Sequence, residues 1–151
     1  MNDINLVGNE KGTTAVETAI IIMFLLIFIF GIIEFGLLLF NKQVLTDASR
    51  RGARAGIVVG LDRFDPVAAD YYVTVSKEEA SDFCEEHLIT FESGVLQILP
   101  PYFDDVDEDG IFDPDVDLLR LHLKYDYDFL FLSAFGIGPI PLNAVSIMKF
   151  E

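Results

Sequence analysis

The residues best suited to chemistry are carboxylates in one short stretch, residues 104–117, where eight of fourteen side chains are acidic. Alternating carboxylates and one backbone carbonyl match the ligand positions of an EF-hand-like calcium loop: Asp105, Asp107, Asp109, Ile111 and Asp113. Gly110 occupies the position of the sharp turn. We therefore expect this loop to bind Ca²⁺, because carboxylates this dense repel one another without a counter-ion.

The match to a calcium loop is incomplete. Val116 stands where the usual bidentate glutamate would be, so Asp115 or Asp117 would have to replace that ligand. The alternative interpretation is an acidic loop that is solvated by water and holds no metal.

Groups for other chemistry are few, and we expect no enzyme. His87 and His122 are the only histidines, and one follows a helical pattern while the other lies on the polar side of a predicted strand. The sequence has no His and Cys spacing typical of a metal site, no phosphate-binding glycine loop and no base beside a nucleophile. The single cysteine, Cys84, is expected to serve packing. We predict no small-molecule substrate.

Charge is divided unevenly along the 151 residues. Residues 1–60 carry five acids and five bases, whereas residues 61–151 carry 20 acids and 5 bases, the whole net charge of −15. The second part must therefore face water. Such an acidic surface repels phosphate backbones, so nucleic acid is excluded as a partner.

An apolar run precedes the acidic part. Residues 18–33 contain no charge, and after Glu34 the apolar character resumes as far as Phe40. The 23 positions 18–40 would extend about 34 Å as a helix, against roughly 30 Å for the hydrocarbon core of a bilayer. We expect a transmembrane helix here and lipid as its surroundings. A cleaved secretory signal fits less well, because no small-x-small site follows the run.

The helix is predicted to continue beyond the membrane. No proline occurs before Pro66, so one helix can run over residues 13–60. Small residues recur at every fourth position of its second half, at Ala48, Gly52, Gly56 and Gly60. Such a stripe lets another backbone approach closely. The alternative is that the helix frays near Gly56, since each glycine costs about 1 kcal/mol of helix propensity.

The acidic region, residues 61–151, is predicted to mix helix and strand. Ser76 and Glu79 form a possible capping box for a short helix over residues 77–91. Residues 119–131 alternate apolar and polar side chains, which is typical of a half-buried strand. A Gly/Pro loop at residues 136–141 leads to a second extended run at 142–150, so we expect an antiparallel hairpin. The fold class is therefore α+β, with a long N-terminal helix.

Two blocks of the N-terminal half carry a resemblance to a known family. They are KGTTAVETA at residues 11–19 and, after the apolar run, GIIEFG at 31–36 with LTDASRRGARA at 45–55. This pattern resembles the TadE-like family, minor pseudopilins of the tight-adherence (Flp-type) pilus machinery. The closing segment, residues 142–151, resembles the last strand of that family.

The resemblance implies processing by a prepilin peptidase. Residues 1–12 would be a leader removed after Gly12, so that Thr13 becomes the first residue and Glu17 the fifth. A free amino group drawn into an apolar helix bundle needs a counter-charge, which Glu17 can supply. The alternative is that Glu17 only complements the positive end of the helix dipole.

Location follows from the same resemblance. It implies a single-pass protein of the bacterial inner membrane with a periplasmic acidic domain, other pilins and pseudopilins as partners, and incorporation into an extracellular pilus. Four bases after the apolar run, Lys42, Arg50, Arg51 and Arg54, favour a cytoplasmic domain by the positive-inside rule. We follow the resemblance, because the peptidase cuts leaders on the cytoplasmic side. The alternative function is a membrane-tethered calcium-binding or adhesion module, for which the helix is only an anchor.

Overall fold

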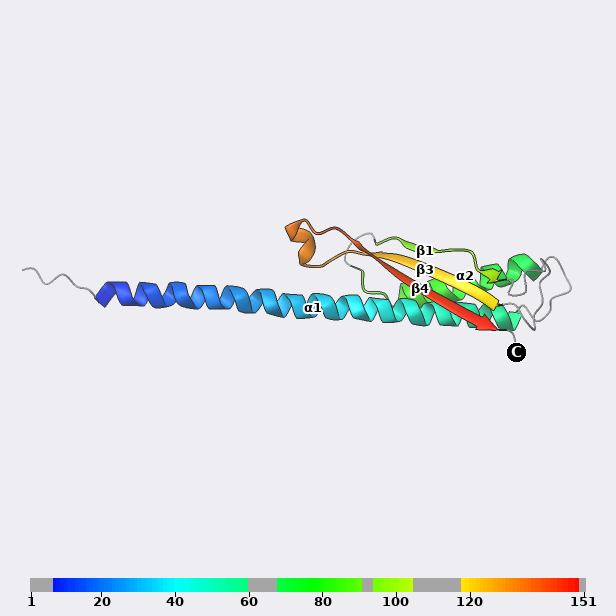
Figure 1. The fold of residues 1–151 in the computed structure, drawn as a ribbon, viewed down its shortest axis with the longest axis horizontal. Coiled ribbons are helices and arrows are strands. Elements are labelled where there is room, and N and C mark those ends of the chain that lie inside the picture. The colour runs from blue at the N-terminus through cyan, green and yellow to red at the C-terminus, as the bar shows by residue number, and fades with distance from the viewer. Residues whose placement is uncertain (1–6, 60–67, 91–93, 105–117, 150–151) are drawn as a thin grey trace, which may run out of the picture. The chain divides into compact units, whose positions relative to one another are not determined.

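The computed structural model describes residues 7–59, 68–90, 94–104 and 118–149 (Figure 1). The chain forms two compact units, Met1–Gly36 and Leu37–Glu151. One helix, α1 (Val7–Val59), begins in the first unit and ends in the second. The predicted α+β class with a long N-terminal helix is confirmed.

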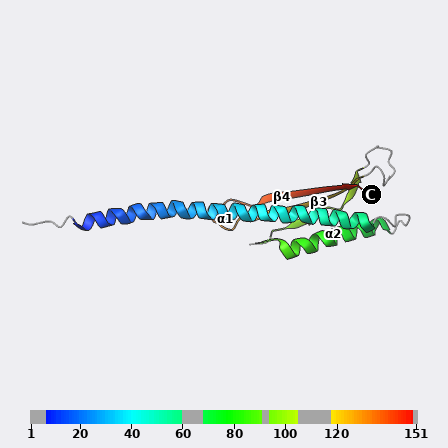
Figure 2. The same ribbon diagram turned by 90° about the horizontal axis from the view of Figure 1, so that it is seen from below.

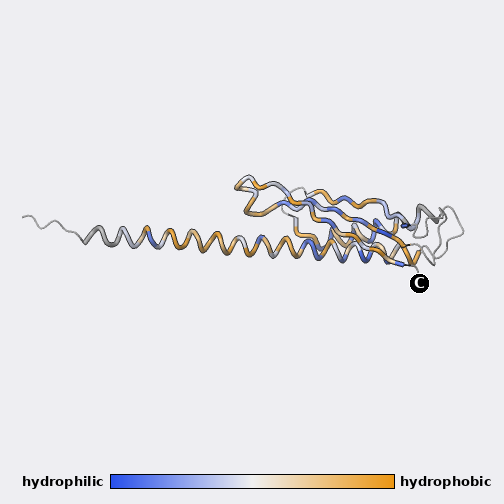
Figure 3. Tube along the Cα trace, in the orientation of Figure 1, coloured by the Kyte–Doolittle hydropathy of each residue, from blue (hydrophilic) through white to orange (hydrophobic). Residues whose placement is uncertain are grey.

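In the first unit, α1 is a single helix whose apolar side chains are exposed. Phe24 is 66% and Phe28 68% exposed, and Figure 3 shows the apolar colouring along this stretch. The helix begins at Val7, six residues before the predicted Thr13. Of the described residues, only α1 forms a helix long and apolar enough to cross a membrane.

Helix α2 (Ala68–His87) differs from its prediction at both ends. The capping box at Ser76 is wrong, because Ser76 lies inside the helix with its side chain buried. The helix ends before residue 91 because Asn41 bonds both backbone groups of Ile89. Those groups are therefore not available to continue the helix.

Two long strands form the centre of the sheet, β3 (Leu118–Tyr127) and β4 (Ile140–Lys149). They pair antiparallel over their whole length, from Leu118 with Lys149 to Tyr127 with Ile140. The predicted alternation and hairpin are confirmed. Pro141 falls within β4, which among the described strands pairs only with β3, and an edge strand tolerates a missing N–H group.

Two short strands that the sequence analysis did not predict cover the other edge of β3. They are β1 (Leu96–Ile98) and β2 (Tyr102–Asp104), both antiparallel to β3. Leu96 faces Tyr125 and Tyr102 faces Arg120, so the pairing shifts by one residue between the two strands. The shift coincides with Pro100 and Pro101, which cannot donate hydrogen bonds to a neighbouring strand.

The core of the second unit lies between its helices and one face of the sheet. Figure 2 shows α1 and α2 on the same side of β3 and β4. The alternate residues of β3 that point to this side are buried: Leu119, Leu121, Leu123, Tyr125 and Tyr127. Leu121, Leu123, Tyr125 and Tyr127 form one cluster with residues of both helices: Leu45, Ala48 and Ala53 of α1 and Ala80 and Cys84 of α2.

Candidate processing and assembly site

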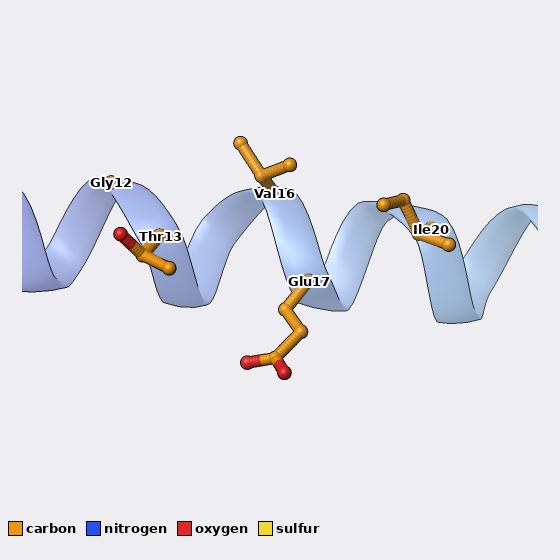
Figure 4. A pocket seen from close by; sticks show the side chains of 5 residues that line it. All are labelled: Gly12, Thr13, Val16, Glu17 and Ile20. Carbon is orange, nitrogen blue, oxygen red and sulfur yellow. The ribbon is translucent and has the colours of Figure 1, made fainter.

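The predicted processing residues lie on an exposed stretch of α1. Figure 4 shows Gly12, Thr13, Val16, Glu17 and Ile20, with Thr13 and Glu17 directed to the same side of the helix and Val16 to the other. Thr13 and Glu17 are four positions apart on the helix, an axial distance of about 6 Å. The arrangement brings a carboxylate within one turn of the Thr13 backbone nitrogen.

Glu17 is exposed and forms no ion pair within the described residues. Next to it, the Thr18 hydroxyl donates to the backbone carbonyl of Thr14 at 2.8 Å, which satisfies that hydroxyl inside an apolar helix. Nothing lies within 4 Å of the position that a Cβ atom at Gly12 would occupy. The fold therefore has room for a larger side chain at residue 12 and does not require glycine there.

A second carboxylate of the apolar run behaves differently. Glu34 is only 2% exposed, while its neighbours Ile33 and Phe35 are 44% and 62% exposed. The sequence analysis assigned Glu34 no role, although a single carboxylate within an apolar run is itself an indication of a functional site.

The small-residue stripe of α1 packs inside the second unit. Ala48 is fully buried, and a Cβ atom on Gly52 would lie 2.5 Å from the backbone oxygen of Ser76 and 2.7 Å from Leu121 Cδ2. A Cβ atom on Gly56 would collide with the Ser76 hydroxyl. These residues let α2 and β3 approach the α1 backbone. Gly60, the last predicted member, lies outside the described residues.

Polar contacts join α1 to the rest of this unit. The buried Asn41 side chain donates from Nδ2 to the Ile89 carbonyl at 2.7 Å and accepts from the Ile89 amide at 3.0 Å. Lys42 Nζ donates to the backbone carbonyl of Asn143 on β4. The sequence gives one signal for the first contact, an asparagine within an apolar helical pattern.

The predicted calcium ligands, Asp105, Asp107, Asp109, Ile111 and Asp113, lie outside the described residues. Within the part of the chain that the structure does describe, no group of three His, Cys, Asp or Glu side chains is placed to hold a metal. Asp104, at the start of the acidic stretch, pairs with Arg120. Hydrogen bonding to that carboxylate raises the pKa of Arg120.

The three remaining candidate groups have structural contacts. Burial raises the pKa of the Cys84 thiol to about 11, which makes it a poor nucleophile at neutral pH. His87 stacks on Phe83 with 4.2 Å between the ring centroids, and its Nδ1 lies 3.0 Å from the Phe83 carbonyl oxygen. His122 lies on the outer face of β3, opposite Val145 of β4.

Comparison with known proteins gives one finding. No curated protein and no solved structure matches the chain. The model of a protein family, described as TadE-like protein, matches residues 12–54. This range contains Gly12, Thr13 and Glu17, the whole apolar run and the helix as far as Arg54. The resemblance to the TadE-like family is thus confirmed over residues 12–54.

Proposed function

We propose that this chain is a non-enzymatic minor pseudopilin that takes part in assembly of a tight-adherence (Flp-type) pilus. The observation that carries the proposal is the family match over residues 12–54, on a helix whose apolar side chains are exposed. Such a helix buries its apolar surface in lipid before assembly and against other pilins and pseudopilins afterwards.

The first step is removal of residues 1–12 by a prepilin peptidase. Gly12 lies within α1, so the helix must open locally to present an extended peptide bond to the peptidase. Glycine lowers the cost of this opening, since its helix propensity is about 1 kcal/mol poorer than that of alanine. The space around Gly12 supports a role for glycine in recognition rather than in folding.

Cleavage creates a positive charge at the new N-terminus, Thr13. The amino group and the helix dipole are both positive at this end, so the new terminus is unfavourable in an apolar bundle. Glu17 lies one turn away, on the side of the helix to which Thr13 is directed. Its carboxylate, from the same or an adjacent subunit, neutralises the amine.

The acidic unit then lies in the periplasm, despite the four bases that follow the apolar run. Three of these bases have contacts within the second unit. Lys42 bonds the Asn143 carbonyl, Arg50 lies 3.9 Å from Asp47, and Arg51 stacks over Phe83 at 4.3 Å. Such contacts give the bases a structural role that does not require the cytoplasmic side. A reporter active only in the periplasm, fused after Glu151, should be active, and activity of a cytoplasmic reporter instead would overturn this topology.

The counter-charge is tested by Glu17→Ala in cells that assemble the pilus. The variant should still be cleaved, but its amount in sheared pili should fall several-fold, because the amine of Thr13 loses its partner. Glu78→Ala is the matched control, since it removes an exposed carboxylate from α2. Recovery of Glu17→Ala at the level of the wild type would contradict the assembly role.

The alternative function, a membrane-tethered calcium-binding or adhesion module, makes the opposite prediction for residues 1–12. A plain anchor needs no cleavage and tolerates Glu17→Ala. Calcium binding by the loop at 104–117 is compatible with either function.

A further inference from the structure

The end of the acidic unit lacks charge entirely over a long stretch. Residues 61–128 contain 19 acids, whereas residues 129–148 contain no charged side chain. This stretch includes residues 130–140, which we call the hairpin tip: they comprise most of the connection between β3 and β4 and the first residue of β4, Ile140. Because this segment carries no charge, it can enter an apolar medium without removing an ion from water, unlike the acidic residues that precede it.

The hairpin tip exposes large apolar side chains. Phe135 is 79% exposed, more than any other large apolar residue that the structure describes, the membrane-length run included. Leu130, Ile137 and Ile140 are 38%, 45% and 41% exposed. A cluster of this kind on a water-facing unit indicates a surface that is covered by something apolar.

The backbone of the tip holds these side chains in a defined turn. A 3₁₀ helix, η1 (Leu132–Phe135), ends at Gly136, whose φ of 78° lies in the left-handed region. The Gly136 amide donates to Ser133 at 2.9 Å and the Ile137 amide to Leu132 at 3.3 Å. Figure 1 shows this turn, coloured orange, beyond the ends of β3 and β4. The exposed apolar residues therefore belong to an ordered turn.

Contacts within the second unit show at which end the tip lies. Gly56 lies beside Leu119 and Gly52 beside Leu121, while Lys42 bonds Asn143, which pairs with Lys124. Lower numbers on α1 thus correspond to higher numbers on β3. The tip follows β3, so it lies past the level of Lys42, at the end where α1 enters the unit at Leu37. Leu39 and Phe40, at the same end, are 50% and 45% exposed.

We propose that the hairpin tip inserts into the interface of the lipid bilayer and forms a membrane contact in addition to the spanning helix. The proposal rests on the membrane span of the proposed function. The insertion is shallow, since the irregular backbone needs hydrated headgroups and cannot enter the hydrocarbon core unpaired. Phe135 and Ile137 reach the acyl boundary, as the apolar faces of interfacial segments do.

The chain contains no tryptophan, so single tryptophans report on chosen positions without background. Phe135→Trp reports on the tip, Phe28→Trp on the spanning helix, and Tyr71→Trp on an exposed site of α2. The full chain is reconstituted in phosphatidylcholine and phosphatidylglycerol vesicles, with bromine placed on the acyl chains either near the headgroup or near the methyl end.

In these vesicles, the emission of Phe135→Trp should shift to the blue and be quenched more strongly by shallow than by deep bromine. Tyr71→Trp should remain unshifted and unquenched. Quenching of Phe28→Trp without quenching of Phe135→Trp would overturn the tip contact and leave the membrane anchor intact. A blue shift of Phe135→Trp without quenching would also overturn it, because a protein would then cover the tip. Absence of quenching at Phe28→Trp would contradict the proposed membrane span itself.

A charge placed on the tip gives a second test, which does not depend on the tryptophan alone. In the Phe135→Trp background, Ile137→Asp should abolish the blue shift and the quenching, since a carboxylate resists transfer out of water. Val145→Asp is the matched control, because Val145 is 49% exposed on the outer face of β4. Equal effects of the two substitutions, or none from Ile137→Asp, would overturn the proposal.

Discussion

The two halves of α1 differ in what surrounds their glycines. Around Gly12, Gly31 and Gly36 nothing lies within 4 Å of a Cβ position, whereas Gly52 and Gly56 have no room for a Cβ at all. The second half is therefore packed by its own chain, through α2 and β3. The first half is the more apolar of the two, yet the chain leaves its large apolar side chains exposed.

This difference indicates where each half obtains its stability. Residues 37–59 belong to the core of a folded unit, so their sequence must fit its neighbours to within a methyl group. Residues 12–36, apart from the buried Glu34, leave their large apolar side chains exposed. Under the proposed function, lipid or the helices of other subunits cover them. One continuous helix thus serves two purposes, and substitutions in its two halves should act differently.

The largest expected effect comes from enlarging a packed glycine. Gly52→Val places new atoms against Ser76, Ala80 and Leu121, and overpacking of this kind costs about 3 kcal/mol of unfolding free energy. Thermal unfolding of the full chain in detergent, followed by near-ultraviolet circular dichroism, measures it. Gly36→Val is the matched control and should leave the unfolding midpoint nearly unchanged. Equal loss of stability in the two variants would remove the distinction between the halves.

A smaller effect is expected from the polar contact at the start of the packed half. Asn41→Ala removes both bonds to Ile89 and leaves a part-buried amide and carbonyl unpaired, at a cost of about 2 kcal/mol. The same unfolding measurement applies. Gln43→Ala, which removes only an exposed contact to Asp47, should cost under about 0.5 kcal/mol. A null effect of Asn41→Ala would mean that the end of α2 is not held by this contact.

The smallest expected effect concerns the acidic loop at residues 104–117, outside α1. If the loop at 104–117 binds Ca²⁺, a concentration ten times the dissociation constant stabilises the full chain by about 1.4 kcal/mol. Magnesium should do less, and Asp107→Asn combined with Asp109→Asn should abolish the shift. An unfolding midpoint indifferent to calcium and to chelator would identify the cluster as a solvated charged loop.

The sequence predicted the elements whose pattern is local and repeated. The absence of proline and the apolar run predicted α1, and strict alternation predicted β3 and its hairpin with β4. The sequence did not predict features that depend on tertiary contacts. The hydroxyl of Ser76 looked like a helix cap, yet it is buried against Gly56 inside α2. Strands β1 and β2 are three residues each, too short for a periodic pattern to be read.

The candidate site could likewise be predicted only in part from the sequence. The spacing of Gly12, Thr13 and Glu17 can be read from the chain, because residues four apart share one face of a helix. The contact of Asn41 with Ile89 spans 48 positions, so the local pattern marks only the asparagine within an apolar helix and does not identify its partner. The exposure of Phe135 likewise depends on how the hairpin turns, since the sequence around it is apolar in the same way as a core strand.

The central claim is that the exposed half of α1 is the processed, assembly-competent segment of a pseudopilin. Mass spectrometry of the N-terminus of the full chain, extracted from membranes of cells with an active prepilin peptidase, tests it most directly. The wild type should begin at Thr13, and Gly12→Ala should retain residues 1–12 although the fold has room for the added methyl group. Wild-type protein that keeps residues 1–12 in those cells would contradict the account.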